Sequence, residues 1–372
     1  MRRHQCPADP LAPSRRRRSE RGLTLLELML SASLGVVLLG AAVAVLLAAG
    51  RMRRNQQLLA DASTEARTAL RHAARALSAA GTGGSTYAYA MGGRQQRAAI
   101  LFTNGTVALS ATMPQKPDSL TLLRYAADRR TSLVSELKGT TVQVTPDPRL
   151  KTTPGVDVTL FAKNEYALIT NYKQAMLVPV LDKKLNTSTR TVDLTVGTAT
   201  EDLQDQEVAI ERGATVFPVQ LVRYRVAYVP PAGKLPERAD LILETLDPQT
   251  LTAMDQTVLA RDIEDFQVQW GYDGNDDGVA DTGYSDVGPA GSSMDPSLTF
   301  ARISISARTS GVLIAGTKDS NGNYDYVVKD ETPFERGLDL GKPKSELPNP
   351  SGYRRRVVST VVLLKNLAAT RI

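Results

Sequence analysis

The strongest pattern of apolar positions lies near the N-terminus. Residues 23–50 contain one charged side chain, Glu27. As a helix this run is ~42 Å long at ~1.5 Å per residue, which exceeds the ~30 Å hydrocarbon core of a bilayer. The run therefore predicts a membrane-spanning helix. An ordinary membrane anchor does not explain Glu27. A charge in hydrocarbon is unfavourable unless it is paired with an opposite charge.

Beyond residue 54 the apolar pattern changes its spacing but does not break. The positions that recur every three or four residues are Leu59, Ala62, Ala66, Leu70, Ala73 and Leu77. This spacing is typical of a helix with one buried face. No proline interrupts residues 23–80, and the GTGG run at 81–84 favours a stop. We therefore predict one continuous helix, with a spanning half at 23–54 and an amphipathic half at 55–84 that packs on the following domain.

From residue 85 onward, short apolar and β-branched runs alternate with Gly, Pro, Asn and Asp, a pattern typical of strands and turns. The predicted strands are 98–103, 119–125, 140–145, 156–162, 176–181, 217–229, 240–246, 265–272, 300–309, 325–330 and 355–367. Few helices intervene, which favours a mainly antiparallel sheet and an α+β fold. Polar or proline-rich composition predicts loops at 183–215 and 331–352. A sub-domain is expected within 130–215.

The distribution of charge and the scarcity of cysteine and histidine argue against several classes of function. The net charge is +6, but residues 1–22 hold seven arginines, so the rest of the chain is close to neutral and no nucleic-acid surface is expected. Arginines concentrated before the apolar run predict a cytoplasmic N-terminus and an exported head. The only cysteine, Cys6, lies in that first segment, and the two histidines, His4 and His72, have no partners at metal-ligand spacing. We expect no enzyme activity, and a structural role for His72.

Three interpretations compete for the N-terminus: a cleaved secretory signal, a single-pass anchor and a pilin signal. A secretory signal has an apolar region of only ~7–15 residues. The sequence Gly22, Leu23, Thr24, two leucines and Glu27 resembles the type III signal of type IV pilins and pseudopilins. The resemblance implies a cytoplasmic leader at 1–22 that the prepilin peptidase removes after Gly22, with methylation of the new N-terminus at Leu23, where the family usually has Phe. The new ammonium group would lie one helical turn from Glu27, in the same subunit or in a neighbour.

Other segments sharpen the resemblance. Residues 67–81, 259–278, 301–309 and 354–367 are similar to landmarks of PilW-type minor pilins, which are related to GspJ-type minor pseudopilins of type II secretion. The resemblance implies a type IV pilin fold, in which the long helix packs on a mainly antiparallel head at 85–372. It implies a minor pilin that primes assembly of a type IV pilus for motility or adhesion and caps it.

The resemblance also implies partners and a location. The partners would be other minor pilins, the major pilin, the prepilin peptidase, the inner-membrane platform protein and a tip adhesin. The chain would cross the inner membrane once, with a periplasmic head, and then enter the pilus at the cell surface. Two alternatives stay open: a minor pseudopilin of a type II secretion system, and a membrane-anchored adhesin or ligand-binding head.

One acidic stretch has metal-ligand spacing. The candidate ligands are Asp273, Asn275, Asp277 and Asp281, with Asp286 as a late carboxylate. Oxygens at positions 1, 3, 5 and 9 of a loop with glycine at position 6 are typical of an EF-hand-like Ca²⁺ loop. The twelfth position is tyrosine instead of glutamate, so the pattern is incomplete. Either the loop binds Ca²⁺ or it is a solvated Asp/Asn/Gly turn.

Overall fold

The computed structural model describes most of the chain from Thr24 to Ser310 and again from Arg355 to Leu364. The gaps within these ranges are 81–88, 92–94, 111–112, 114, 126–128, 138, 146–160, 162–164, 172–174, 187, 190, 198–209, 233–236, 276, 282 and 290–296. The predicted leader, the predicted strand at 325–330, the predicted loop at 331–352 and nearly all of the predicted strand at 156–162 lie outside the described residues.

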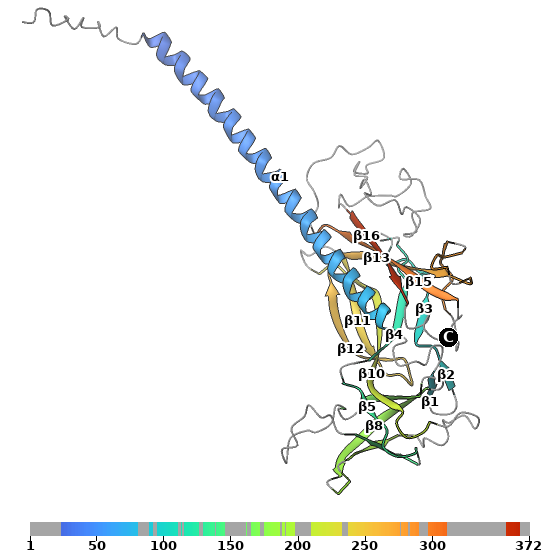
Figure 1. Ribbon diagram of the computed structural model, residues 1–372. Coiled ribbons are helices and arrows are strands. Elements are labelled where there is room, and N and C mark those ends of the chain that lie inside the picture. The colour runs from blue at the N-terminus through green and yellow to red at the C-terminus, as the bar shows by residue number, and fades with distance from the viewer. Residues whose placement is uncertain are drawn as a thin grey trace, which may run out of the picture. The chain divides into compact units, whose positions relative to one another are not determined.

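Helix α1 (Leu25–Ala79) is continuous over 55 residues, as predicted (Figure 1). The chain divides into two compact units, residues 1–54 and 55–372, and the helix contributes residues to both. In the first unit the large apolar side chains are exposed; Leu25, for example, is 80% exposed. By length and composition this helix qualifies as a candidate membrane span, and its most apolar 18-residue window has no buried residue.

In the second unit, one face of α1 is buried. The buried residues are Ala62, Ala66, Ala69, Leu70, Ala73 and Leu77. Five of these six were predicted from the spacing; Leu59 is only half-buried, and Ala69 takes its place. Alanines dominate this face, and their small side chains allow the helix backbone to approach the strands closely. The amphipathic half of the helix therefore belongs to the core of the head.

Twelve strands form the larger sheet. They are β1 (Tyr89–Met91), β2 (Gln95–Arg97), β3 (Ile100–Thr103), β4 (Ser119–Tyr125), β5 (Thr131–Ser132), β6 (Thr141–Val144), β7 (Tyr166–Thr170), β8 (Ala175–Asn186), β9 (Thr191–Val196), β10 (Thr215–Val229), β11 (Arg238–Leu246) and β12 (Ala253–Ala260). The main path runs β12-β11-β10-β7-β8-β1-β2, and the other strands pair beside it. Only β1 and β8 pair in parallel among the described strands. The prediction of a mainly antiparallel sheet is confirmed.

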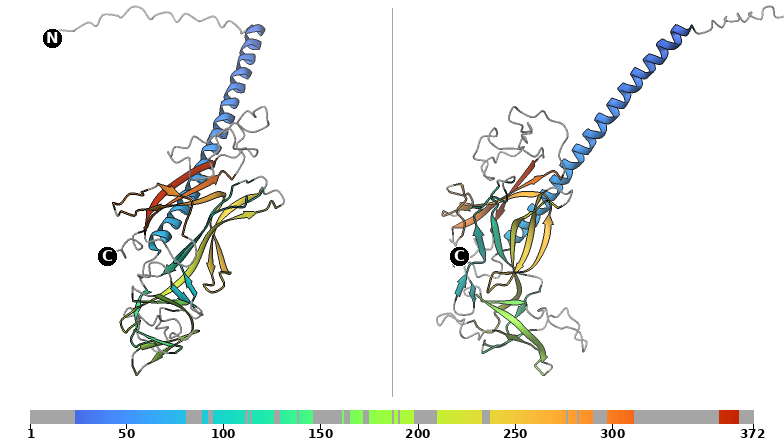
Figure 2. Two further views of the ribbon diagram at one scale, coloured as in Figure 1. Left: turned by 90° about the vertical axis from the view of Figure 1, so that its right-hand side faces the viewer. Right: turned by 180° about the vertical axis from the view of Figure 1, so that it is seen from behind.

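The smaller sheet has four strands, in the order β14-β13-β15-β16. Their bounds are β13 (Ile263–Tyr272), β14 (Tyr284–Ser285), β15 (Leu298–Arg308) and β16 (Arg355–Leu363). All three pairings are antiparallel. Figure 2 shows this orange-to-red sheet next to one end of the yellow strands of the larger sheet. Strand β16, which is far from the other three in the sequence, pairs with β15 at the end of this sheet. In that pairing Arg308 lies opposite Arg355.

The head has separate apolar cores. The main core combines the buried face of α1 with strands of both sheets, and Trp270, Phe266 and Tyr224 are its largest buried rings. A second core collects residues between Leu133 and Val216, mainly from β6 to β9. Strand β10 reaches both: Val216 lies in the second core, and Tyr224 lies in the main one.

The expectation of a loop throughout 183–215 was wrong. Strand β8 continues to Asn186, and β9 lies wholly within the range. The pattern in β8 changes from buried apolar to mostly exposed polar, because its fully buried residues lie in its first half. Its polar part pairs with β9 through the backbone, which polar side chains do not prevent. Strand β12 was also missed, because most of its residues are exposed at the end of the sheet's main path.

Candidate functional site at the helix start and in the acidic head

The start of α1 is held by a reciprocal contact between Thr24 and Glu27. The Glu27 Oε2 atom accepts hydrogen bonds from the backbone N of Thr24 at 3.1 Å and from its Oγ1 at 3.2 Å. In return, the backbone N of Glu27 donates to Thr24 Oγ1 at 3.2 Å. This is a capping box, in which a Thr at the N-cap and a Glu three residues later satisfy backbone donors of the first turn.

The capping box gives Glu27 a second role that the sequence prediction overlooked. A T-x-x-E motif directly before an apolar run is the signal that would have indicated it. Glu27 is therefore held at the helix start even before any leader is removed. Gly22 and Leu23 lie outside the described residues, so cleavage after Gly22 and pairing of the Leu23 amine with Glu27 both stay predictions.

The acidic loop after β13 brings three of its carboxylates together. Ligand atoms of Asp273, Asp277 and Asp281 all lie within 4.8 Å of one another. Asp273 is buried, whereas the other two are exposed. Asn275 is linked to the group, because its Nδ2 donates to Asp277 Oδ2 at 3.1 Å. Asp286 is not in the group; its Oδ1 accepts a hydrogen bond from Gln269 Nε2 at 2.9 Å.

Backbone bonds shape the loop around these carboxylates. Gly278 N donates to Asp273 Oδ2 at 3.0 Å, and Gly274 N donates to Asp281 Oδ2 at 2.7 Å. Gly278 has a φ of 83°, a value that glycine adopts without a steric penalty. Carboxylate oxygens that converge from alternate loop positions fit a hard cation such as Ca²⁺. The donor set thus fits the predicted Ca²⁺ loop for the three aspartates.

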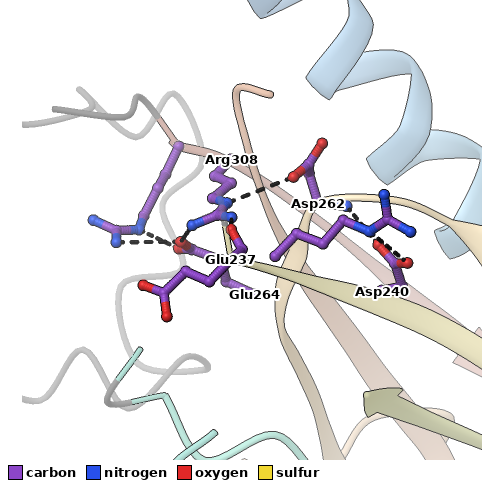
Figure 3. Close-up of polar contacts among 7 residues, drawn as sticks. Glu237, Asp240, Asp262, Glu264 and Arg308 are labelled. Carbon is purple, nitrogen blue, oxygen red and sulfur yellow. Dashed lines mark hydrogen bonds and ion pairs between the residues drawn. The ribbon is translucent and has the colours of Figure 1, made fainter. Parts of the chain in front are cut away.

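A buried ionic cluster connects the two sheets (Figure 3). Arg308 at the end of β15 is 2% exposed and lies 3.6 Å from Asp262 Oδ1 and 3.7 Å from Glu264 Oε1. It also donates to the backbone carbonyl of Glu237. Glu264 in turn binds Arg355 of β16. The cluster therefore attaches the C-terminal strand to the rest of the smaller sheet.

The same cluster continues into the larger sheet. Asp240 of β11 binds Arg238 at 3.1 Å and accepts a hydrogen bond from the backbone N of Asp262 at 3.3 Å. Burial raises the pKa of Asp262, and nearby Asp240 raises it further, whereas Arg308 opposes both. Nothing in the sequence indicated this cluster, because its members come from four strands and one turn.

A second buried carboxylate, Glu244 of β11, has two arginine partners on β10. Its oxygens lie 2.5 Å from Arg223 Nη2 and 2.6 Å from Arg225 Nη2. Burial alone would raise the pKa of Glu244, but hydrogen bonds and charge from the two arginines outweigh it and lower the pKa. Because Arg223 and Arg225 alternate with buried Tyr224, β10 presents its ionic side away from the main core.

The part of the chain that holds the acidic loop and the ionic cluster matches a known family. Residues 231–366 match the family model of PilW, described as type IV pilus-assembly protein W. This region of the chain is therefore similar to PilW-type proteins. No curated protein matches the chain.

The PilW match covers just over a third of the chain, and it includes β11, β12 and every strand of the smaller sheet. It confirms the resemblance drawn from residues 259–278 and from the C-terminal strand. The match supports a role related to type IV pilus assembly. Helix α1 lies outside the matched region, so its apolar half adds an independent indication of membrane anchoring.

Proposed function

We propose that this protein is a minor pilin, a structural subunit that primes assembly of a type IV pilus and caps it. The observation that carries the proposal is the PilW match in a chain whose N-terminal helix has an exposed apolar half. Such a half is unstable in water and needs lipid or the helices of other subunits around it. The subunit leaves the inner membrane with its head on the periplasmic side and reaches the cell surface in the pilus.

Glu27 is the residue that makes the apolar half competent for assembly. Cleavage after Gly22 creates an ammonium group at Leu23, one helical turn from the carboxylate. The capping box with Thr24 already fixes Glu27 at the helix start. Pairing with the amine of the same or a neighbouring subunit neutralises both charges in hydrocarbon, where each alone is costly.

The processing step is tested by mass spectrometry of the protein extracted from membranes. The expected mature N-terminus is a methylated Leu23. A chain that keeps its leader, or one cut at another residue, would overturn the proposal.

The role of Glu27 is tested by replacing it. Glu27→Ala is expected to permit cleavage but to reduce the number of pili, because the mature amine loses its partner. Ser33→Ala is the matched control, since Ser33 lies on the same exposed apolar half and its hydroxyl donates to the backbone carbonyl of Leu30. Normal piliation with Glu27→Ala would refute an essential pairing role.

Two other functions are distinguished by separate observations. A minor pseudopilin of a type II secretion system would be encoded beside secretion genes, whereas a minor pilin would be encoded beside pilus genes. A membrane-anchored adhesin or ligand-binding head would bind a glycan or a surface without the apolar half of the helix. The absence of such binding in the soluble fragment 55–372, which keeps the buried face of α1, would argue against that head.

We also propose that the acidic loop binds Ca²⁺ through Asp273, Asp277 and Asp281. The support is the loop spacing together with the convergence of these three side chains. Calorimetric titration with Ca²⁺ should give heat that Asp281→Asn abolishes, whereas Asp255→Asn, an exposed aspartate on β12, should leave it unchanged. No heat and no thermal shift with the unmodified protein would eliminate the site.

A further inference from the structure

Three arginines follow the apolar half of α1 without a gap. Arg51, Arg53 and Arg54 are all exposed, and they come directly after the apolar run at 23–50. The large apolar side chains before them are exposed as well; Leu46, for example, is 71% exposed. All of these residues belong to the first compact unit. The surface of the helix thus changes from apolar to cationic within about one turn.

The three arginines, which we call the arginine collar, point in different directions around the helix. At ~100° per residue, Arg53 lies about 200° and Arg54 about 300° around the axis from Arg51. A partner helix or sheet on one side would therefore contact only part of the collar. The phosphates of a lipid layer surround a spanning helix and can contact all three arginines.

The arginine collar has no acidic counterpart nearby in the chain. No Asp or Glu lies between Glu27 and Asp61. None of the three arginines makes an ion pair with another residue that the structure describes. Arginines on the exported side of a span also oppose its orientation, because positive charge favours the cytoplasmic side. The collar therefore needs an anion from outside the chain.

We propose that the arginine collar binds the phosphate groups of anionic phospholipids in the leaflet that faces the head. The choice of leaflet rests on the proposed function, which places the head on the periplasmic side. Guanidinium groups match phosphate oxygens with paired hydrogen bonds. The long arginine side chain also reaches the headgroups from the edge of the hydrocarbon.

Lipid binding at the collar sets the depth of the helix. The stretch from Glu27 to Arg51 is ~36 Å long at ~1.5 Å per residue, whereas the hydrocarbon core is ~30 Å thick. A tilt of ~20° still leaves ~34 Å along the membrane normal. With Arg51 at one edge of the core, Glu27 lies beyond the other edge, among headgroups and water. The carboxylate then needs its partner only when assembly surrounds it with apolar helices.

The test of lipid binding uses the full chain, extracted in mild detergent and mixed with equal amounts of phosphatidylglycerol and phosphatidylcholine. Every sample carries Gln in place of the arginines at 15–18 and of Arg21, so that the leader does not bind the lipid itself. Native mass spectrometry counts the bound lipids of each kind. The chain with its collar should retain at least about fivefold more phosphatidylglycerol than phosphatidylcholine. The collar variant, Arg51→Gln with Arg53→Gln and Arg54→Gln, should lose this preference.

The matched control removes the same charge from the same helix. It replaces three exposed arginines of the second half, as Arg67→Gln, Arg71→Gln and Arg75→Gln, and should keep the preference for phosphatidylglycerol. Equal loss in the two triple variants, or no preference in the chain that keeps its collar, would overturn the proposal. Circular dichroism checks that each variant is folded.

Inorganic phosphate is the probe for a free anion as the alternative ligand. At equal ionic strength it should displace no more phosphatidylglycerol than chloride does, because the lipid is also held by its acyl chains next to the apolar helix. Stronger displacement by phosphate than by chloride would overturn the assignment to a lipid headgroup.

The depth of the helix is tested in cytoplasmic-side-out membrane vesicles from a host without pilus genes, with the natural leader. Cys6, the only cysteine, is replaced by serine, and a single cysteine is introduced as Leu28→Cys or Leu38→Cys. A water-soluble maleimide should label Leu28→Cys, next to Glu27, but not Leu38→Cys in the middle of the span. Protection of Leu28→Cys would overturn the depth. None of these results depends on piliation, and a pilus defect in Glu27→Ala tests the proposed function separately.

Discussion

At the scale of single residues, His72 and Tyr224 join helix and sheet through titratable groups. The Nδ1 of His72 lies 3.0 Å from the Oη of Tyr224, and their rings are 5.8 Å apart. Burial lowers the pKa of His72, and the charges of Arg124 and Arg75 lower it further. Burial raises the pKa of Tyr224 to about 12, although Arg124 opposes this. Both groups are therefore held neutral over a wide pH range.

This contact predicts a loss of stability on mild acidification. In the unfolded chain His72 takes up a proton near its ordinary pKa of 6.5, whereas the folded chain resists protonation until lower pH. The unfolded state then binds more protons, so the free energy of unfolding falls as the pH drops below about 6.5. Thermal unfolding of the full chain in detergent at pH 7.5 and 5.5 measures the effect. His72→Gln, which still offers Tyr224 a hydrogen bond, should reduce the difference between the two pH values; an unchanged difference would contradict the role of His72.

At the scale of elements, the fit between α1 and the strands depends on small side chains. Ala66, Ala69 and Ala73 are completely buried. A larger side chain at these positions would push the helix off the main core.

Ala69→Leu is therefore expected to lower the free energy of unfolding by about 1–3 kcal/mol. Ala60→Leu, at an exposed position of the same helix, is the matched control and should have almost no effect. Denaturant unfolding of the full chain measures both. Equal effects of the two substitutions would show that the helix does not pack closely.

The ionic cluster predicts a second effect at this scale. Arg308→Met keeps an apolar stem of similar length but leaves Asp262 and Glu264 with one cation fewer in a buried site. Removing one partner from a buried ionic contact costs about 3–5 kcal/mol. The exposed Arg212 provides the control, since Arg212→Met should change stability by less than about 0.5 kcal/mol. A similarly small change for Arg308→Met would show that the cluster does not hold β16 in place.

At the scale of the whole molecule, the head contains more than one core. The second core gathers residues from Leu133 to Val216 and shares long strands with the rest of the sheet. Fully buried Leu194 of β9 belongs to this second core, whereas the buried face of α1 belongs to the main core. The sub-domain at 130–215 stays a prediction. It implies that the second core unfolds separately from the main core, which a substitution in the second core tests.

Leu194→Ala should lower the free energy of unfolding by about 2–5 kcal/mol, the usual range when a buried leucine is replaced by alanine. If the second core unfolds separately, hydrogen exchange should accelerate in β6 and β9 and stay unchanged in β13 and β15. Leu298→Ala, in the main core, should give the reverse pattern. Acceleration throughout the head with either variant would show a single cooperative unit.

The local patterns of the sequence determined the long helix, several strands and the acidic loop. Helix α1 and strands such as β4, β10 and β11 were predicted almost to the residue, because their spacing follows directly from which side chains are buried. The three aspartates of the acidic loop were also predicted, since neighbours along a tight loop are close in space whatever the fold. The PilW resemblance rested on the same kind of continuous segment.

Only the tertiary structure decided which distant residues meet. Arg308, Glu264 and Arg355 come together because three strands pair in one register, and no local spacing encodes that register. Strand β12 was missed because most of its residues are exposed. Strand β9 is mostly buried, and it was missed because it lies within a range whose overall polar composition predicted a loop. Backbone pairing with a neighbour holds both strands in the sheet. The sequence thus determined the elements through local burial and backbone preference. The fold decided the ionic cluster and the separate cores, because both depend on contacts between residues far apart in the chain.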